Sequence, residues 1–232
     1  EGRCKAERLG YFAEQALEQI GDAQQFIMVG TSAPVAFFAY PGKASRFTAD
    51  DATLHTLAEV HENAEDALQR LVEAVGAQQQ KPRYAALKKP GLLTGELSPK
   101  ALAFAVAEYM PEDCIVADES GVTGGICFPV TSNTVRHDWL RLSGGSIGYG
   151  LPCAIGAAVA CPERKVLCLH GDGGAMYTIQ SLWTMVREQL DICVVIFANR
   201  KYQILQVELA RVGAESVSPK TLDMMDLSNP DL

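Results

Sequence analysis

The 232-residue sequence contains no Cys-x-x-Cys pair, few aromatic residues (7%) and fewer basic than acidic side chains. With 28 acidic and 20 basic residues the net charge is −8, and a surface of this sign repels phosphate backbones, which argues against a nucleic-acid partner. Seven cysteines without paired spacing fit neither a zinc site nor a secreted disulfide framework. We therefore expect reduced, buried thiols and a cytoplasmic protein.

Long apolar runs are also missing. The most apolar stretch, residues 147–161, is interrupted by glycines and by Pro152 and is too short to span a bilayer, and no signal-peptide pattern opens the chain. We therefore expect no membrane partner. A hydrophobic content of 48% is still sufficient for a globular core. The sequence starts at Glu1 rather than Met and stops without a closing element, so we interpret it as a piece of a longer polypeptide.

Apolar runs and helical periodicity alternate along the chain. Strands are predicted at 26–29, 114–117, 166–169 and 192–197, and helices at 7–20, 62–75, 98–109, 153–160 and 175–190, while 51–60 is ambiguous. The strands are apolar at successive positions, which is typical of a parallel sheet covered by helices on both faces, an α/β fold. A polar, proline-containing linker at 81–97 separates a first domain, 1–80, from a second, 98–232.

Three loops are predicted to lie near the carboxyl ends of these strands, where ligands bind in such sheets: 118–125, 143–151 and 170–175. In the third loop, Gly171, Gly173 and Gly174 lie between a strand and a helix start. Glycine permits close approach of the backbone, and the amides at a helix start favour a phosphate. The loop is therefore a candidate phosphate site.

A dinucleotide-binding turn is the rival interpretation of this loop. Its fingerprint requires a third glycine where this chain has Met176, and Asp172 lies inside the turn. Two like charges about 4 Å apart repel by roughly 4 kcal/mol at an effective dielectric of 20, which exceeds what a helix terminus contributes. A divalent cation between carboxylate and phosphate reverses the sign, and Mg²⁺ suits one carboxylate with phosphate oxygens. Asn199, after the next strand, offers a second oxygen, and the backbone carbonyl of Lys201 a third.

Several segments resemble those of thiamine-diphosphate-dependent enzymes. They are Gly171-Asp-Gly173 with its spacing to Asn199, the loop Gly144-Gly-Ser-Ile-Gly-Tyr-Gly-Leu-Pro152, and the helix Met176-Tyr-Thr-Ile-Gln-Ser-Leu-Trp-Thr184. Within that superfamily the chain resembles the acetolactate synthase and benzoylformate decarboxylase group. The resemblance implies a thiamine-diphosphate-binding fold over the second domain, preceded by part of a Rossmann-like central domain.

The resemblance also implies roles for individual residues. Asp172, Asn199 and the Lys201 carbonyl would ligate Mg²⁺. The diphosphate would be held by the amides of Gly173 and Gly174 and by backbone near Gly121 and Val122. Ile147 would prop the cofactor in a bent conformation, the Gly145 carbonyl would accept a hydrogen bond from its aminopyrimidine, and Tyr202 would lie near the site without an assigned role. Ala198 stands where the family often has a first of two asparagines, and the second, Asn199, is kept as the ligand.

The activity implied is decarboxylation of a 2-oxo acid, with release of an aldehyde or transfer to a second 2-oxo acid, which makes the enzyme a lyase or transferase. The activating glutamate is expected in an absent N-terminal domain contributed across a subunit interface, so no catalytic residue is assigned in this chain. We expect a homodimer or homotetramer and an inactive isolated chain. The family leaves FAD open, and nothing in this segment supports it.

Two other functions stay open, an NAD(P)-binding dehydrogenase domain and a non-catalytic thiamine-enzyme homologue. Simpler readings also apply to single residues. His170 is expected to pack in the core rather than react, His137 to contact substrate or the loop backbone, and the charges of 118–121 to form either part of the site or a solvated loop.

Overall fold

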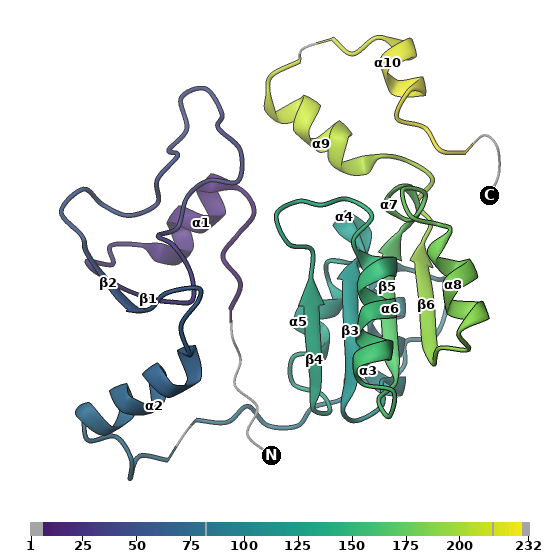
Figure 1. Ribbon diagram of the computed structural model, residues 1–232. Coiled ribbons are helices and arrows are strands. Elements are labelled where there is room, and N and C mark those ends of the chain that lie inside the picture. Colours follow the sequence, from purple (N-terminus) through teal and green to yellow (C-terminus); the bar gives the residue numbers. More distant parts are fainter. Residues whose placement is uncertain (1–6, 82, 215, 229–232) are drawn as a thin grey trace. The chain divides into compact units, whose positions relative to one another are not determined.

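The computed structural model describes residues 7–81, 83–214 and 216–228, which form two compact units that divide between Arg83 and Tyr84 (Figure 1). The division lies inside the predicted linker 81–97. The outer limits of the predicted domains, in 1–6 and 229–232, lie outside the described residues.

The first unit is built on a parallel pair of strands. It contains α1 (Ala13–Ile20), β1 (Gln25–Val29), β2 (Thr53–Ala58) and α2 (Ala64–Ala74), with Gln25 opposite Thr53. The ambiguous segment 51–60 is thus a strand. Asn63 caps α2, since its side chain accepts a hydrogen bond from the N–H of Asp66. This parallel pair with a following helix is compatible with part of a Rossmann-like domain, an assignment that stays a prediction.

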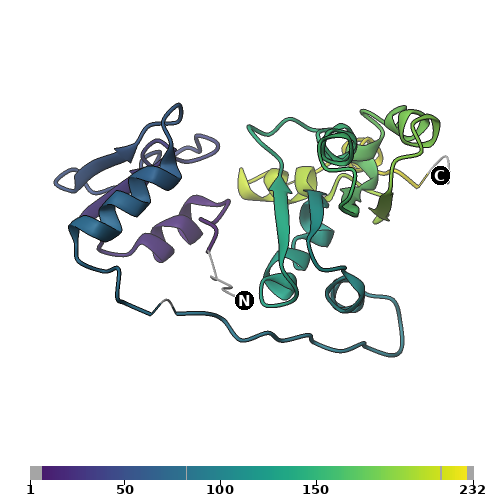
Figure 2. The same cartoon turned by 60° about the horizontal axis from the view of Figure 1, so that its bottom comes forward.

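The second unit is a four-stranded parallel sheet in the order β4-β3-β5-β6 (Figures 1 and 2). Its strands are β3 (Cys114–Glu119), β4 (His137–Arg141), β5 (Val166–Gly171) and β6 (Ile192–Phe197). Its helices are α3 (Pro99–Tyr109), α4 (Gly121–Gly124), α5 (Cys127–Thr131), α6 (Gly150–Ala160), α7 (Asp172–Ala175), α8 (Ser181–Arg187), α9 (Gln203–Arg211) and α10 (Pro219–Asp223).

Helices cover both faces of this sheet, as the continuous apolar strands predict. Cys114 and Val116 of β3 pack with α3 and α5 on one face, while Ile115 and Ala117 pack with α6 and α8 on the other. β5 alternates in the same way. The predicted α/β architecture is confirmed for this unit.

Several elements differ from the sequence-based predictions. The helix expected at 7–20 begins only at Ala13, and the helices α4, α5, α9 and α10 were not predicted. The expected helix 175–190 is broken: Tyr177, Thr178 and Ser181 donate i→i−3 hydrogen bonds, and the Thr178 hydroxyl donates to the carbonyl of Gly148 at 2.8 Å. The strand β4 was not predicted at all, since its sequence, His-Asp-Trp-Leu-Arg, is largely polar. β4 lies at the edge of the sheet, where one side of a strand faces no neighbour and charged side chains are accommodated.

The cysteines of the described residues carry free thiols. Burial raises the pKa of Cys127 and of Cys168 to about 12, which keeps both thiols protonated. Cys193 is exposed, and Cys4 lies outside the described residues. Among the described helices, none combines the length and apolar character needed to cross a bilayer.

Candidate functional site

The carboxyl ends of three strands of the second unit, β3, β5 and β6, lie next to one another at the same end of the sheet. The parallel register pairs Glu119 with His170 and Gly171 with Phe197, so the segments that leave β3, β5 and β6 are neighbours. These segments carry most of the predicted site residues, namely Gly121, Val122, Asp172, Gly173, Gly174, Asn199, Lys201 and Tyr202. The topology therefore gathers the predicted metal and diphosphate residues at the edge where α/β sheets bind ligands.

The carboxylate of Asp172, at the start of α7, is held by two backbone amides. Gly173 N donates to Oδ1 at 2.9 Å, and Arg200 N, from the loop after β6, donates to Oδ2 at 2.7 Å. Arg200 has a left-handed backbone (φ 57°), which is rare for a long side chain and is found at functional sites. The second bond spans the two strand tips, and both carboxylate oxygens keep lone pairs for a cation.

Three hydrogen bonds orient the side chain of Asn199. Its Nδ2 donates to Thr123 Oγ1 at 2.9 Å and to Gln203 Oε1 at 3.1 Å, while its Oδ1 accepts from Lys201 N at 3.1 Å. Because both amide hydrogens meet acceptors, turning the group over would break these bonds. Oδ1 is therefore the Asn199 atom that a cation would use.

Lys201 and Tyr202 continue this loop. The Lys201 carbonyl accepts from Gln203 N at 2.9 Å and keeps one lone pair. The Tyr202 ring packs directly on Gly173, where a Cβ atom would come within 2.5 Å of Cε1. Tyr202, predicted near the site without a role, thus has a packing contact with the turn after β5.

The loop after β3 reaches the same place through Thr123. Gly121 starts α4 with a positive φ of 60°, and the side chain of Val122 is 47% exposed. The hydroxyl of Thr123 in the same short helix accepts the hydrogen bond from Asn199. The backbone near Gly121 and Val122 is therefore tied to the predicted metal ligand across the sheet edge.

The remaining predicted residues, Gly145 and Ile147, lie on the glycine-rich segment of residues 144–150, hereafter loop 144–150. Gly145 has a positive φ of 70°, and Ile147 is 57% exposed. Ile147 lines an apolar surface hollow of about 720 Å³, whose other lining residues are Leu140, Ser146, Gly148, Tyr149, Pro152, Cys153, Gly156, Ala157 and Ala160. Among the described residues, no hydrogen bond joins Gly145 or Ile147 directly to Asp172 or Asn199.

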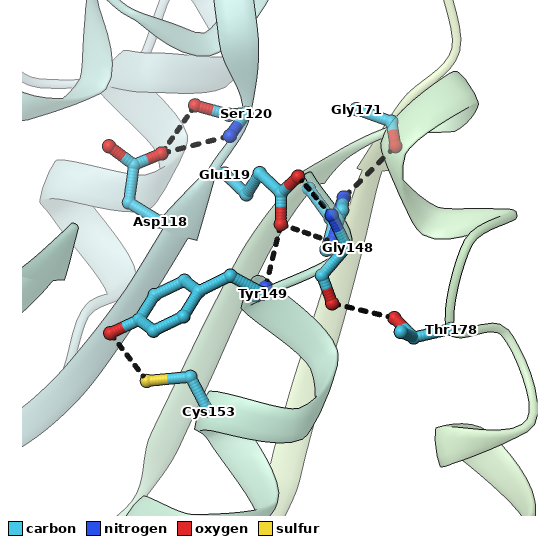
Figure 3. A network of polar contacts seen from close by, with 10 residues as sticks. Asp118, Glu119, Ser120, Gly148, Tyr149, Cys153, Gly171 and Thr178 are labelled. Carbon is cyan, nitrogen blue, oxygen red and sulfur yellow. Dashed lines mark hydrogen bonds and ion pairs between the residues drawn. The ribbon is translucent and has the colours of Figure 1, made fainter. Parts of the chain in front are cut away.

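Loop 144–150 is held by a buried carboxylate that the sequence reasoning did not single out (Figure 3). Glu119, the last residue of β3, accepts hydrogen bonds from Gly148 N (2.6 Å, Oε1) and Gly150 N (2.7 Å, Oε2). Its Oε2 lies 3.1 Å from Nε2 of His170, whose side chain is completely buried. His170 is therefore a core residue, as predicted.

The charge of Glu119 is stabilised in place. Burial, the largest influence, raises the pKa of this carboxyl, but the adjacent His170 imidazole and the hydrogen bonds from the backbone of Gly148 and Gly150 together hold it below its ordinary value. Glu119 is thus a carboxylate at neutral pH, with a side chain only 7% exposed.

The neighbouring Asp118 is also buried and fully engaged. It accepts from the backbone and hydroxyl of Ser120 and from Trp139 Nε1, at distances between 2.6 and 3.0 Å. The reading of 118–121 as a solvated loop is therefore wrong, because side chains from two strands and loop 144–150 enclose both carboxylates. His137 Nδ1 lies 2.7 Å from the carbonyl of Val135, which is the backbone role, and the residue starts β4 rather than a loop.

The donor set at the sheet edge fits Mg²⁺ only in company with an anionic ligand. The described residues contain no group of three His, Cys, Asp or Glu side chains that would hold a metal ion alone. Asp172 supplies one charged oxygen and Asn199 a neutral one, a set that suits a cation whose remaining ligands are phosphate oxygens and water. The residues present therefore fit a Mg²⁺-diphosphate group.

Comparisons with known proteins agree with this chemistry. Residues 127–231 match the family model described as "Thiamine pyrophosphate enzyme, C-terminal TPP binding domain". An acetolactate synthase large subunit-like protein, IlvX, from Mycobacterium tuberculosis is 46% identical over 97% of this chain and 44% of its own length. Benzoylformate decarboxylase from Pseudomonas aeruginosa is 29% identical over 72% of this chain and 30% of its own length.

A solved structure shares the fold. The thiamine diphosphate-dependent 4-hydroxybenzoylformate decarboxylase from Rhodococcus jostii RHA1 superposes with a TM-score of 0.70 and 22% identity, over 94% of this chain and 43% of that one. The chain thus spans less than half the length of these relatives.

Proposed function

Because residues 127–231 match the model of the C-terminal thiamine pyrophosphate-binding domain of thiamine pyrophosphate enzymes, we propose that this chain supplies the diphosphate- and Mg²⁺-binding half of an enzyme acting on 2-oxo acids. The observation that carries the proposal is the bond from Arg200 N to Asp172 Oδ2, which brings the tips of β5 and β6 together with Asn199 beside them. The names of the relatives, acetolactate synthase and benzoylformate decarboxylase, support a 2-oxo acid as substrate.

Each residue has a defined part in holding the cofactor. The Asp172 carboxylate, Asn199 Oδ1 and the Lys201 carbonyl would coordinate Mg²⁺. The amides of Gly173 and Gly174, with backbone near Gly121 and Val122, would bind the diphosphate; Gly173 N now donates to Asp172 and would share its hydrogen. Ile147 and the Gly145 carbonyl would fix the bent conformation from loop 144–150.

The chemistry of the reaction comes from the cofactor, since bound thiamine diphosphate supplies the carbanion and the electron sink for decarboxylation of a 2-oxo acid. The chain's own residues bind and orient it. The glutamate that activates the pyrimidine is expected outside these residues, so we propose that the chain alone does not turn over pyruvate or benzoylformate. The complete enzyme would be a cytoplasmic homodimer or homotetramer, either a decarboxylase or a carboligase.

Calorimetry with thiamine diphosphate, with and without Mg²⁺, tests the proposal. The parent chain should bind the cofactor tightly only when Mg²⁺ is present, and Asp172→Ala should abolish this metal dependence. Asp191→Ala is the matched control, because Asp191 precedes β6 at the opposite end of the sheet. Its affinity should equal that of the parent chain.

Two results would overturn the proposal. Unchanged Mg²⁺ coupling in Asp172→Ala would mean that the ligand is wrong. Binding of NAD(P) without metal, and none of thiamine diphosphate, would favour the dehydrogenase alternative.

A further inference from the structure

Loop 144–150 contains two turn hydrogen bonds, from Ser146 N to the carbonyl of Ser143 and from Tyr149 N to the carbonyl of Ser146, and it is also held by side chains from two other segments. Glu119 binds the N–H of Gly148 and of Gly150, and Thr178 Oγ1 donates to the carbonyl of Gly148 at 2.8 Å. Both backbone groups of Gly148 are therefore hydrogen-bonded to side chains, the N–H to Glu119 of β3 and the carbonyl to Thr178 in the segment after α7 (Figure 3).

The two buried side chains leave little space beside Gly150 and Gly174. A Cβ on Gly150 would lie 2.7 Å from His170 Cδ2 and 3.1 Å from Glu119 Cβ. A Cβ on Gly174 would lie 3.0 Å from His170 Cε1 and 3.1 Å from Glu119 Oε1. The Glu119–His170 pair thus fills the space beneath loop 144–150 and beneath the turn after β5 at once.

We infer that Glu119 is a positioning residue for the cofactor. It fixes the position of loop 144–150, which carries Gly145 and Ile147, relative to the diphosphate residues. The inference rests on the proposed function, because only that function gives Gly145 and Ile147 a ligand. A carboxylate suits this task, since one group accepts two backbone N–H bonds, whereas a glutamine at the same place has one acceptor oxygen and an amide that would face an N–H.

The first test measures amide hydrogen exchange in the cofactor-free 232-residue chain. Glu119→Gln should speed exchange across residues 144–150 by about tenfold or more, because the loop loses a charge-assisted hydrogen bond, while β3 and β5 stay protected. Glu112→Gln is the matched control, since Glu112 is exposed and precedes the other end of β3, and it should change nothing. Unchanged exchange of the loop in Glu119→Gln would overturn the inference.

The second test separates positioning from general stability. Glu119→Gln should weaken Mg²⁺-thiamine diphosphate binding by about 10- to 100-fold. It should leave Mg²⁺-pyrophosphate binding nearly unchanged, because none of the hydrogen bonds that hold Asp172 and Asn199 involves Glu119. Equal losses for both ligands would show a merely structural role and overturn the inference.

Thr178→Val serves as a second variant, because it removes the opposite hydroxyl bond with little change of shape. Thr178→Val should also weaken Mg²⁺-thiamine diphosphate binding more than Mg²⁺-pyrophosphate binding, but by less than Glu119→Gln does. A Thr178→Val chain that binds both ligands like the parent would contradict a contribution of Thr178 to holding the loop. If the parent binds neither ligand, the proposed function fails and the inference with it. If the parent binds and Glu119→Gln binds equally well, only the inference fails.

Discussion

The two glycine-rich segments at the sheet edge use glycine for different physical reasons. In loop 144–150, Gly144, Gly145 and Gly148 adopt positive φ angles of 60°, 70° and 90°. In the turn of residues 171–175, none of the glycines has a positive φ. The loop therefore needs glycine for its backbone conformation, while the turn needs it for the close approach of side chains such as the Tyr202 ring.

This difference corresponds to how each segment is held in place. The turn continues from a central strand directly into α7, so its position follows from the sheet. The loop links the edge strand β4 to α6, and its backbone groups are bound by the side chains of Glu119 and Thr178. Two glycine-rich motifs can therefore look alike in sequence and still be held in place by different contacts.

The strongest test of the comparison is Gly148→Ala, where conformation and contact act together. With φ at 90° and a Cβ that would lie 2.7 Å from Tyr177 Cβ, we expect a loss of about 3 kcal/mol in the free energy of unfolding. Gly144→Ala is the control, since it shares the positive φ and has nothing within 4 Å; it should cost about 1 kcal/mol. Urea unfolding measures both, and equal losses would contradict the contribution of the Tyr177 contact.

The next test separates contact from conformation within one helix. Gly150→Ala at the start of α6 would place its Cβ 2.7 Å from His170, and since that imidazole is buried we expect a loss of about 2 kcal/mol. Gly156→Ala in the same helix has open space and should be neutral or up to about 1 kcal/mol stabilising. Thermal unfolding compares them, and a Gly150→Ala chain as stable as Gly156→Ala would show that His170 moves aside freely.

Much of the second unit was predictable because parallel strands buried on both faces are apolar at every position. That pattern predicts β3, β5 and β6, and the parallel pairing of β5 with β6 brings Asp172 and Asn199 to adjacent strand ends. β4 was not predictable by the same criterion, because an edge strand with His137, Asp138 and Arg141 carries no apolar run.

The features of the site that the sequence did not predict depend on contacts between segments far apart in the chain. The helix break at 176–180 depends on Thr178 reaching the carbonyl of Gly148, and the burial of Glu119 depends on glycines that make room beside it. Neither feature has a local sequence signal. The position of Glu119 at the end of an apolar run does not by itself indicate that its carboxylate binds another loop.

A smaller effect should appear in the pH dependence of stability. Since hydrogen bonds hold the pKa of Glu119 below its ordinary value of 4.5, the folded chain binds this proton less readily than the unfolded chain. The stability it contributes is therefore complete above about pH 4.5 and is lost as the pH falls through the lower folded value. Parent and Glu119→Gln should differ by on the order of 1 kcal/mol near neutral pH, and the difference should shrink on acidification. A difference that grows in acid would contradict a stabilised carboxylate.

The smallest expected effect concerns the turn, where the crowding atoms belong to a side chain that can rotate. Gly173→Ala would place its Cβ 2.5 Å from Tyr202 Cε1, and we expect a loss of about 1 kcal/mol, because the half-buried ring can swing away. In a Tyr202→Ala background the same substitution should cost almost nothing, which a double-mutant cycle by urea unfolding measures as coupling. A cost that persists without the ring would mean that Tyr202 is not the side chain that requires glycine here, since Leu227 Cδ1 would also lie 3.2 Å from the new Cβ, and the explanation offered for the turn would be wrong.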